Sequence, residues 1–169
     1  MKVIRCSLAA VFILLLSSCG KSSKLTPLLP DAPEGWKTEG SATTKDVSGT
    51  GHSSARSYTP TAAGSGVQRV TVQILVSEKG ADPRQIQTMG LENKAMFKER
   101  KEVGGFPAYE SFPLPSNDTH SLDILPAGGK WVQIVAYRGG AEWENGENRR
   151  KVVSAFAAKV DLKKVAAQE

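Results

Sequence analysis

A short run of alternating apolar side chains near the middle of the chain limits its fold most strongly. Residues 70–76 read VTVQILV, and every second position is β-branched: Val70, Val72, Ile74 and Val76. Because successive side chains of a strand point to opposite faces, this period of two predicts a β-strand with one buried face. Thr71 and Gln73 would lie on the wetter face.

Other segments predict partners for this strand. Residues 121–125 and 130–137 are apolar and β-branched, and the PAGG sequence at 126–129 between them predicts a hairpin. Residues 56–59 are expected to pair with 70–76 across a turn at 64–66. Even spacing of Phe106, Ala108 and Phe112 predicts another strand, and Pro107 and Pro113 make it an edge or bulged strand, because proline lacks the backbone donor.

Two helices complete the predicted fold. Asp82 and Pro83 suit a helix start, and a loose apolar stripe extends that helix to about Lys98. The second helix has its apolar face at Val152, Val153, Phe156, Ala157 and Val160. Asp161 is expected to break or re-cap it, with Leu162 and Val165 packing in a last turn. The fold class is therefore α+β, a mainly antiparallel sheet packed by two principal helices.

The first 18 residues form a separate functional unit. Lys2 and Arg5 precede an apolar run from Leu8 to Leu16, and no acidic residue occurs in this stretch. A helix that spans a bilayer needs roughly 20 apolar residues, so this run is too short. The layout is that of a secretory signal peptide, and residues 1–18 are expected to be removed.

The sequence Leu16-Ser17-Ser18-Cys19 resembles the lipobox of bacterial lipoproteins. The resemblance implies that Cys19 becomes the N-terminus and the lipid attachment site, acylated with fatty acids such as palmitate. It also implies that the partner of Cys19 is the lipid bilayer. Because Gly20, not Asp, follows Cys19, the resemblance favours the outer membrane, on its periplasmic side.

The remaining chain divides into a tether and one domain. Residues 19–33, rich in proline and polar residues, are expected to form a flexible tether, and residues 34–169 a single α+β domain with Trp36 and Tyr58 in its core. Export removes Cys6, and lipidation occupies Cys19, which leaves no cysteine for a disulfide. Export also removes two of the 22 basic side chains and none of the 17 acidic ones, which weakens any indication of nucleic-acid binding.

The globular part resembles the small domain shared by the photosystem subunit PsbP and the Mog1 family. The resemblance depends on Pro33-Glu34-Gly35-Trp36, the hairpin 122–137 and the closing Val160-Asp161-Leu162. It implies a binding or assembly role and transfers no functional residue. A lipid-anchored, non-enzymatic binding or accessory module for a protein or envelope component is therefore the expected function.

Two motifs offer enzymatic alternatives. Residues 51–55, GHSSA, have the outline of a nucleophile elbow, which would make Ser53 a nucleophile with His52 or His120 as base in a small envelope hydrolase. A flexible loop is the preferred interpretation, because an elbow requires a buried strand before the serine and a helix after it. Residues 127–130 contain the GK pair of a phosphate loop but lack its other residues, so they are interpreted as a turn.

One cluster contains the residue types of a metal site. Asp118, His120 and Asp123 have metal-ligand chemistry, but in an extended segment Asp123 would face away from His120, and a solvated turn is preferred. No metal or cofactor is therefore expected.

Two surface features and one further function remain open. Arg149, Arg150 and Lys151 are a candidate partner surface, although a solvated helix face is the preferred interpretation. Three aromatic residues could line a binding groove, although a place in the core is the preferred interpretation: Trp131, Tyr137 and Trp143. A small-ligand carrier is a further alternative, and it would require a deep apolar pocket between sheet and helix.

Overall fold

A computed structural model describes residues 22–47, 51–62, 66–77, 99–111, 118–126 and 129–168. The signal sequence, Cys19 and the helix predicted over 82–98 lie outside the described residues. Within the described part of the chain, no helix is long and apolar enough to cross a membrane.

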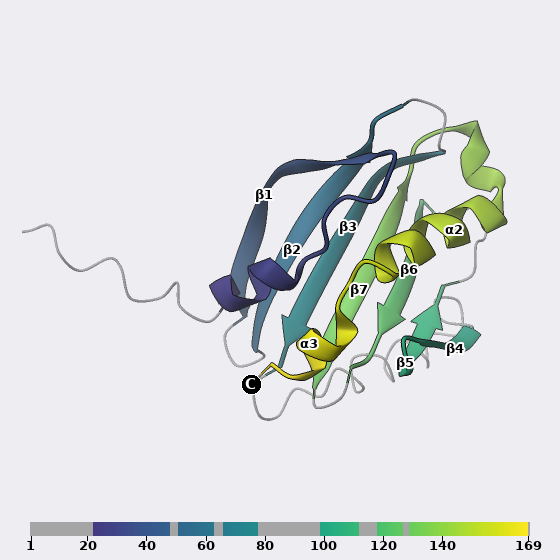
Figure 1. The fold of residues 1–169 in the computed structure, drawn as a ribbon. Coiled ribbons are helices and arrows are strands. Elements are labelled where there is room, and N and C mark those ends of the chain that lie inside the picture. The colour runs from purple at the N-terminus through teal and green to yellow at the C-terminus, as the bar shows by residue number, and fades with distance from the viewer. Residues whose placement is uncertain are drawn as a thin grey trace, which may run out of the picture.

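The described strands form one antiparallel sheet of seven strands (Figure 1). In spatial order they are β1 (Trp36–Val47), β2 (Gly51–Pro60), β3 (Val67–Val76), β7 (Lys130–Arg138), β6 (Thr119–Ile124), β5 (Phe106–Glu110) and β4 (Glu99–Val103). Each strand pairs antiparallel with its neighbours. The α+β class with an antiparallel sheet is thus confirmed, including the β2–β3 pairing and the β6–β7 hairpin.

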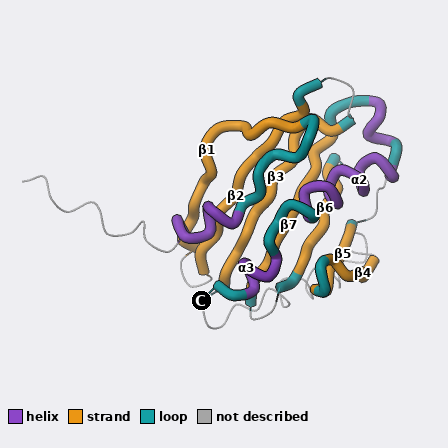
Figure 2. The backbone as a smooth tube through the Cα atoms, in the orientation of Figure 1, coloured by secondary structure: helices purple, strands orange, loops and turns teal. Residues whose placement is uncertain are grey.

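The described helical segments pack over one face of this sheet (Figures 1 and 2). They are η1 (Ser22–Leu28), η2 (Ala141–Glu144), α2 (Gly146–Ala157) and α3 (Leu162–Ala166). Asn145 caps α2 by accepting hydrogen bonds from the backbone of Glu147 and Asn148, and Asp161 caps α3 by accepting one from Lys164. The predicted re-capping at Asp161 is therefore confirmed.

The core fills the space between the sheet and α2. The alternating residues of β3 are buried as predicted, together with Ile134 of β7 and Leu122 of β6. Phe156 of α2 packs against Tyr58 and edge-on against Trp36, with ring centroids 4.8 and 5.2 Å away. Aromatic pairs in this geometry add to the stability that burial provides.

The segment expected to be a free tether packs against the domain instead. From Ser22 the chain forms η1, and Leu25 and Leu29 are buried in the core. Pro30 accepts hydrogen bonds from the Tyr58 hydroxyl (2.5 Å) and from Arg56 (3.3 Å). Prolines and polar residues dominate the composition of this segment, but two buried leucines and these hydrogen bonds hold it on the sheet.

The segment 51–55 was expected to be a loop, and this prediction is wrong. These residues begin β2, where Ser53 and Ser54 are buried. Gly51 has φ of 127°, and a Cβ there would lie 2.1 Å from the carbonyl oxygen of Val76. Ser54 shares a hydrogen bond with Thr26 of η1 (3.0 Å). Small residues let β2 lie close to its neighbours, so a sequence that looks flexible forms a strand.

The strand containing Pro107 is not at the edge. β5 lies between β4 and β6, and its hairpin partner β4 is the strand at this edge of the sheet. Pairing with β6 runs from Ala108 to Glu110, and beyond it Leu125 donates to the Pro107 carbonyl at 2.9 Å. In an antiparallel strand the N and the C=O of one residue point to the same neighbouring strand, which for Pro107 is β6. The N–H that Pro107 lacks is therefore missing only where the β5–β6 pairing has ended, and no hydrogen bond of that pairing is lost.

Candidate functional site

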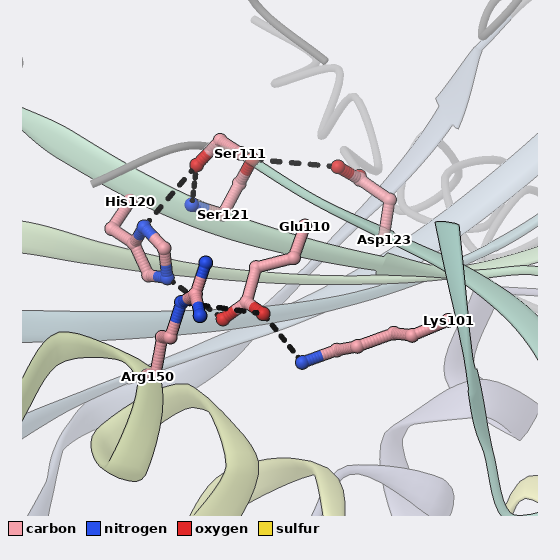
Figure 3. Close-up of polar contacts among 7 residues, drawn as sticks. All are labelled: Lys101, Glu110, Ser111, His120, Ser121, Asp123 and Arg150. Atoms are coloured by element: carbon pink, nitrogen blue, oxygen red, sulfur yellow. Dashed lines mark hydrogen bonds and ion pairs between the residues drawn. The ribbon is translucent and has the colours of Figure 1, made fainter. Parts of the chain in front are cut away.

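A charged network is buried where β5 and β6 meet α2 (Figure 3). Glu110 of β5 is 1% exposed and His120 of β6 is fully buried. Both occupy alternation positions that face the helices, in register with Leu122 and Ala136 on neighbouring strands. A buried carboxylate requires compensating donors, and this site supplies them from three elements.

Glu110 is the centre of the network. One carboxylate oxygen accepts from His120 Nε2 at 2.9 Å, and the other from Lys101 Nζ of β4 at 2.5 Å. Arg150 Nε of α2 lies 4.0 Å from the second oxygen. Burial alone would raise the pKa of Glu110, but the hydrogen bonds from His120 and Lys101 and their charges outweigh it and lower that pKa below its usual value.

Ser111 lies beside His120 and can form a hydrogen bond with it. Its Oγ accepts the backbone N–H of Ser121 at 2.8 Å and lies 3.4 Å from His120 Nδ1. The Ser111 hydroxyl can therefore donate to Nδ1, while Nε2–H donates to Glu110. Ser111, His120 and Glu110 thus form one hydrogen-bonded chain, with the proton positions on the imidazole assigned from these hydrogen bonds.

A second buried carboxylate lies on the other face of the same strands. Asp123 accepts from Trp131 Nε1 at 3.0 Å, Gln133 Nε2 at 2.9 Å and Ser121 Oγ at 3.4 Å. Burial is the main influence on Asp123 and raises its pKa. Ser121 connects the two groups, because its backbone contacts Ser111 and its hydroxyl contacts Asp123 (Figure 3).

The structure separates Asp118, His120 and Asp123, and the preferred solvated turn is wrong for His120 and Asp123, which are buried in strand β6. His120 and Asp123 lie on opposite faces of β6, as predicted from the alternation, and Asp118 is exposed, 3.7 Å from Arg138. Among the described residues, no group of three His, Cys, Asp or Glu is placed to hold a metal ion.

Ser53 does not meet either proposed base. His52 and Ser53 are consecutive in β2 and point to opposite faces, and β3 and β7 separate β2 from His120 on β6. The serine beside His120 is Ser111, which no sequence motif indicated. The signal for this network was a Glu and a His at alternating positions of apolar strands, where a charged residue must find a partner.

The run Arg149, Arg150 and Lys151 does not form one surface. Arg149 is buried, with its guanidinium 4.8 Å from the ring centre of Trp143. Arg150 points toward Glu110, whereas Lys151 is exposed and pairs with Glu147 at 2.9 Å. Consecutive helical residues are rotated by about 100° from one another, so only Lys151 of the three is fully presented to solvent.

The three aromatic residues also fall in different places. Trp143 is buried beside α2, whereas Trp131 and Tyr137 lie half-buried on the sheet face that α2 does not cover. Arg69 stacks over Tyr137 at 4.6 Å. The described side chains therefore form no single aromatic groove.

An open groove of about 630 Å³ lies at the η2 end of the sheet. Its walls include Lys37, Thr61, Gln68, Gly140 and Glu142. The lining mixes charged and hydrogen-bonding groups with apolar residues such as Pro60, Ala62 and Val67.

Comparisons of the chain with models of protein families, with curated proteins and with solved structures find no match.

Proposed function

We propose that this chain is a lipid-anchored envelope protein with a non-enzymatic binding or accessory domain. Cleavage after residue 18 and acylation of Cys19 would attach it to the outer membrane on the periplasmic side. The observation that supports this proposal most is the order of Lys2, Arg5, the apolar run 8–16 and Leu16-Ser17-Ser18-Cys19. The ligand of the domain is proposed to be a protein or another envelope component.

A PsbP/Mog1-like arrangement is the proposed finer form of the fold. The antiparallel sheet, the chain 33–36 leading into β1, and the C-terminal α2 and α3 packed on one face support it. Proteins with this arrangement act mostly in binding and assembly. Such a role fits the described residues better than a carrier role, because buried side chains fill the space between the sheet and α2.

Acyl labelling tests the anchor. The wild-type protein is expected to incorporate radiolabelled palmitate and to enter the detergent phase on phase separation. Cys19→Ala should abolish the labelling and leave the precursor uncleaved. Cys6→Ala is the matched control and should behave as wild type. Unchanged labelling of Cys19→Ala would refute the anchor.

A serine hydrolase is the second candidate, because Ser111, His120 and Glu110 are joined as a nucleophile, a base and an orienting carboxylate. In such a reaction Ser111 Oγ would attack a carbonyl carbon and its proton would pass to His120 Nδ1. A fluorophosphonate probe distinguishes the two functions. The binding module predicts no labelling, whereas labelling lost in Ser111→Ala and kept in Ser53→Ala would establish the hydrolase.

A further inference from the structure

The short distance between Cys19 and the folded domain restricts where the bilayer can lie. If Cys19 is acylated, as proposed above, its lipid lies at most three residues from Ser22, where η1 begins. Three extended residues span about 10 Å. Because η1 is packed on the sheet through Leu25 and Leu29, the domain cannot swing away from the membrane on a tether.

The end of the domain nearest Ser22 is basic. η1 contacts α3, and both lie over the same face of the sheet (Figure 1). Four exposed lysines belong to η1, α3 and the chain between α2 and α3: Lys24, Lys159, Lys163 and Lys164. The one acidic residue described in the same turn, Asp161, pairs with Lys164 at 3.2 Å, and its carboxylate also caps α3.

The opposite end of the domain is acidic. Asp118, Glu142, Glu144 and Glu147 are exposed around η2 and the start of α2, with Arg138 near two of them. The ten residues of β3 run from this end toward the other, a separation of about 30 Å. Among the described residues, basic side chains therefore predominate at the η1–α3 end, and acidic ones around η2, where Lys37 and Arg138 are exposed basic residues.

We infer that the η1–α3 end, defined by Lys24, Lys159, Lys163 and Lys164, docks on the anionic headgroups of the bilayer. Lysines near such a surface are attracted to it, and η1, which begins three residues after Cys19, contacts α3. The acidic η2 end, with its open groove, then faces away from the membrane toward a partner. This inference depends on the proposed acylation of Cys19.

Site-specific quenching tests this orientation in the full lipidated protein. Ala167 at the end of α3 and Ala141 in η2 are both exposed, so Ala167→Cys and Ala141→Cys give matched labelling sites. The mature chain has no other reactive thiol once Cys19 is acylated. Each labelled protein is reconstituted into vesicles of phosphatidylethanolamine and phosphatidylglycerol that contain a headgroup nitroxide quencher. The label at 167 should be quenched and the label at 141 should not.

Charge reversal separates docking from simple attachment. Lys159→Glu with Lys163→Glu should lose the quenching at 167, as should about 1 M salt, at which the Debye length is about 3 Å. Lys37→Glu with Lys151→Glu, far from the η1–α3 end, should retain it. Retained quenching in the first variant would overturn the electrostatic docking.

The outcomes also separate this inference from the anchor. Vesicle flotation with equal quenching at 141 and 167 would overturn the orientation and leave the anchor intact. Failure of the wild-type protein to float or to incorporate palmitate would overturn the anchor, and the orientation with it.

Discussion

Glu110 shows how one residue sets the chemistry of its surroundings. Its carboxylate is buried and accepts from Lys101 and His120, two donors from different strands. Removing one partner of a buried ion pair lowers stability by more than the pair contributes to it, because the remaining charged group is left buried without a hydrogen-bond partner. The network therefore holds the edge hairpin β4–β5 in place.

Glu110→Gln is expected to lower the free energy of unfolding by about 1 to 3 kcal/mol at pH 7, measured by urea denaturation. Glu102→Gln, at an exposed position of β4, serves as control and should change it by less than about 0.5 kcal/mol. Equal effects of the two substitutions would contradict the role given to the network.

The same carboxylate makes stability dependent on pH. Because the folded-state pKa of Glu110 is lowered, its contribution is present above the usual carboxyl range and lost as pH falls through the folded value. Wild-type stability should therefore decrease as pH falls below the usual carboxyl value of 4.5, and Glu110→Gln should reduce that decrease. An identical pH profile in both proteins would show that Glu110 does not titrate as described.

Tyr58 gives the opposite dependence at high pH. Burial raises the pKa of its hydroxyl to about 12, so the unfolded chain releases this proton first. Stability should then fall as pH rises between about 10 and 12. Tyr58→Phe should flatten this fall in thermal unfolding curves, and a steeper fall in the variant would contradict the assignment.

At the level of elements, η1 is the clearest departure from expectation. If residues 22–28 were a free tether, replacing a leucine there with alanine would not change the stability of the domain. If η1 is packed, the same replacement leaves a cavity and lowers stability. Leu25→Ala should destabilise the domain by about 2 to 5 kcal/mol, as buried leucines usually do. Pro27→Ala, at an exposed position of the same segment, is the control and should cost much less. A negligible change in the free energy of unfolding for Leu25→Ala would contradict the packing of η1 and favour a flexible tether.

The elements that the sequence predicts well are those with a strong local period. β3 follows from its alternation, the β6–β7 hairpin from two apolar runs with glycines between them, and α3 from Asp161. β1 and β4 were missed because TEGSATTK and ERKEV contain few apolar residues. β1 and β4 are strands because neighbouring strands pair with them, so their local composition does not predict them.

The candidate site was only partly predictable for a related reason. His120 was recognised as chemically useful, but Glu110, Lys101 and Ser111 were not, because strand register decides which residues meet. Register depends on the whole sheet. Arg149 was likewise assigned to the surface, since one helical stripe cannot show that Trp143 will cover it.

At the scale of the whole molecule, the proposed protein consists of an export and lipidation signal followed by a domain whose two ends differ in charge. The chain begins to pack within three residues of Cys19, and basic and acidic side chains gather at opposite ends of the sheet. An anchored domain with this charge arrangement would present its acidic end and the adjoining groove to partners.

The central claim is that Cys19 is the acylated N-terminus of the mature protein. Intact-mass analysis of protein extracted from membranes tests it most directly. The account predicts a chain that begins at Cys19, with a mass increase matching a diacylglyceryl group, with or without a third acyl chain. A chain that retains residues 1–18, or that begins at an unmodified Cys19, would contradict it.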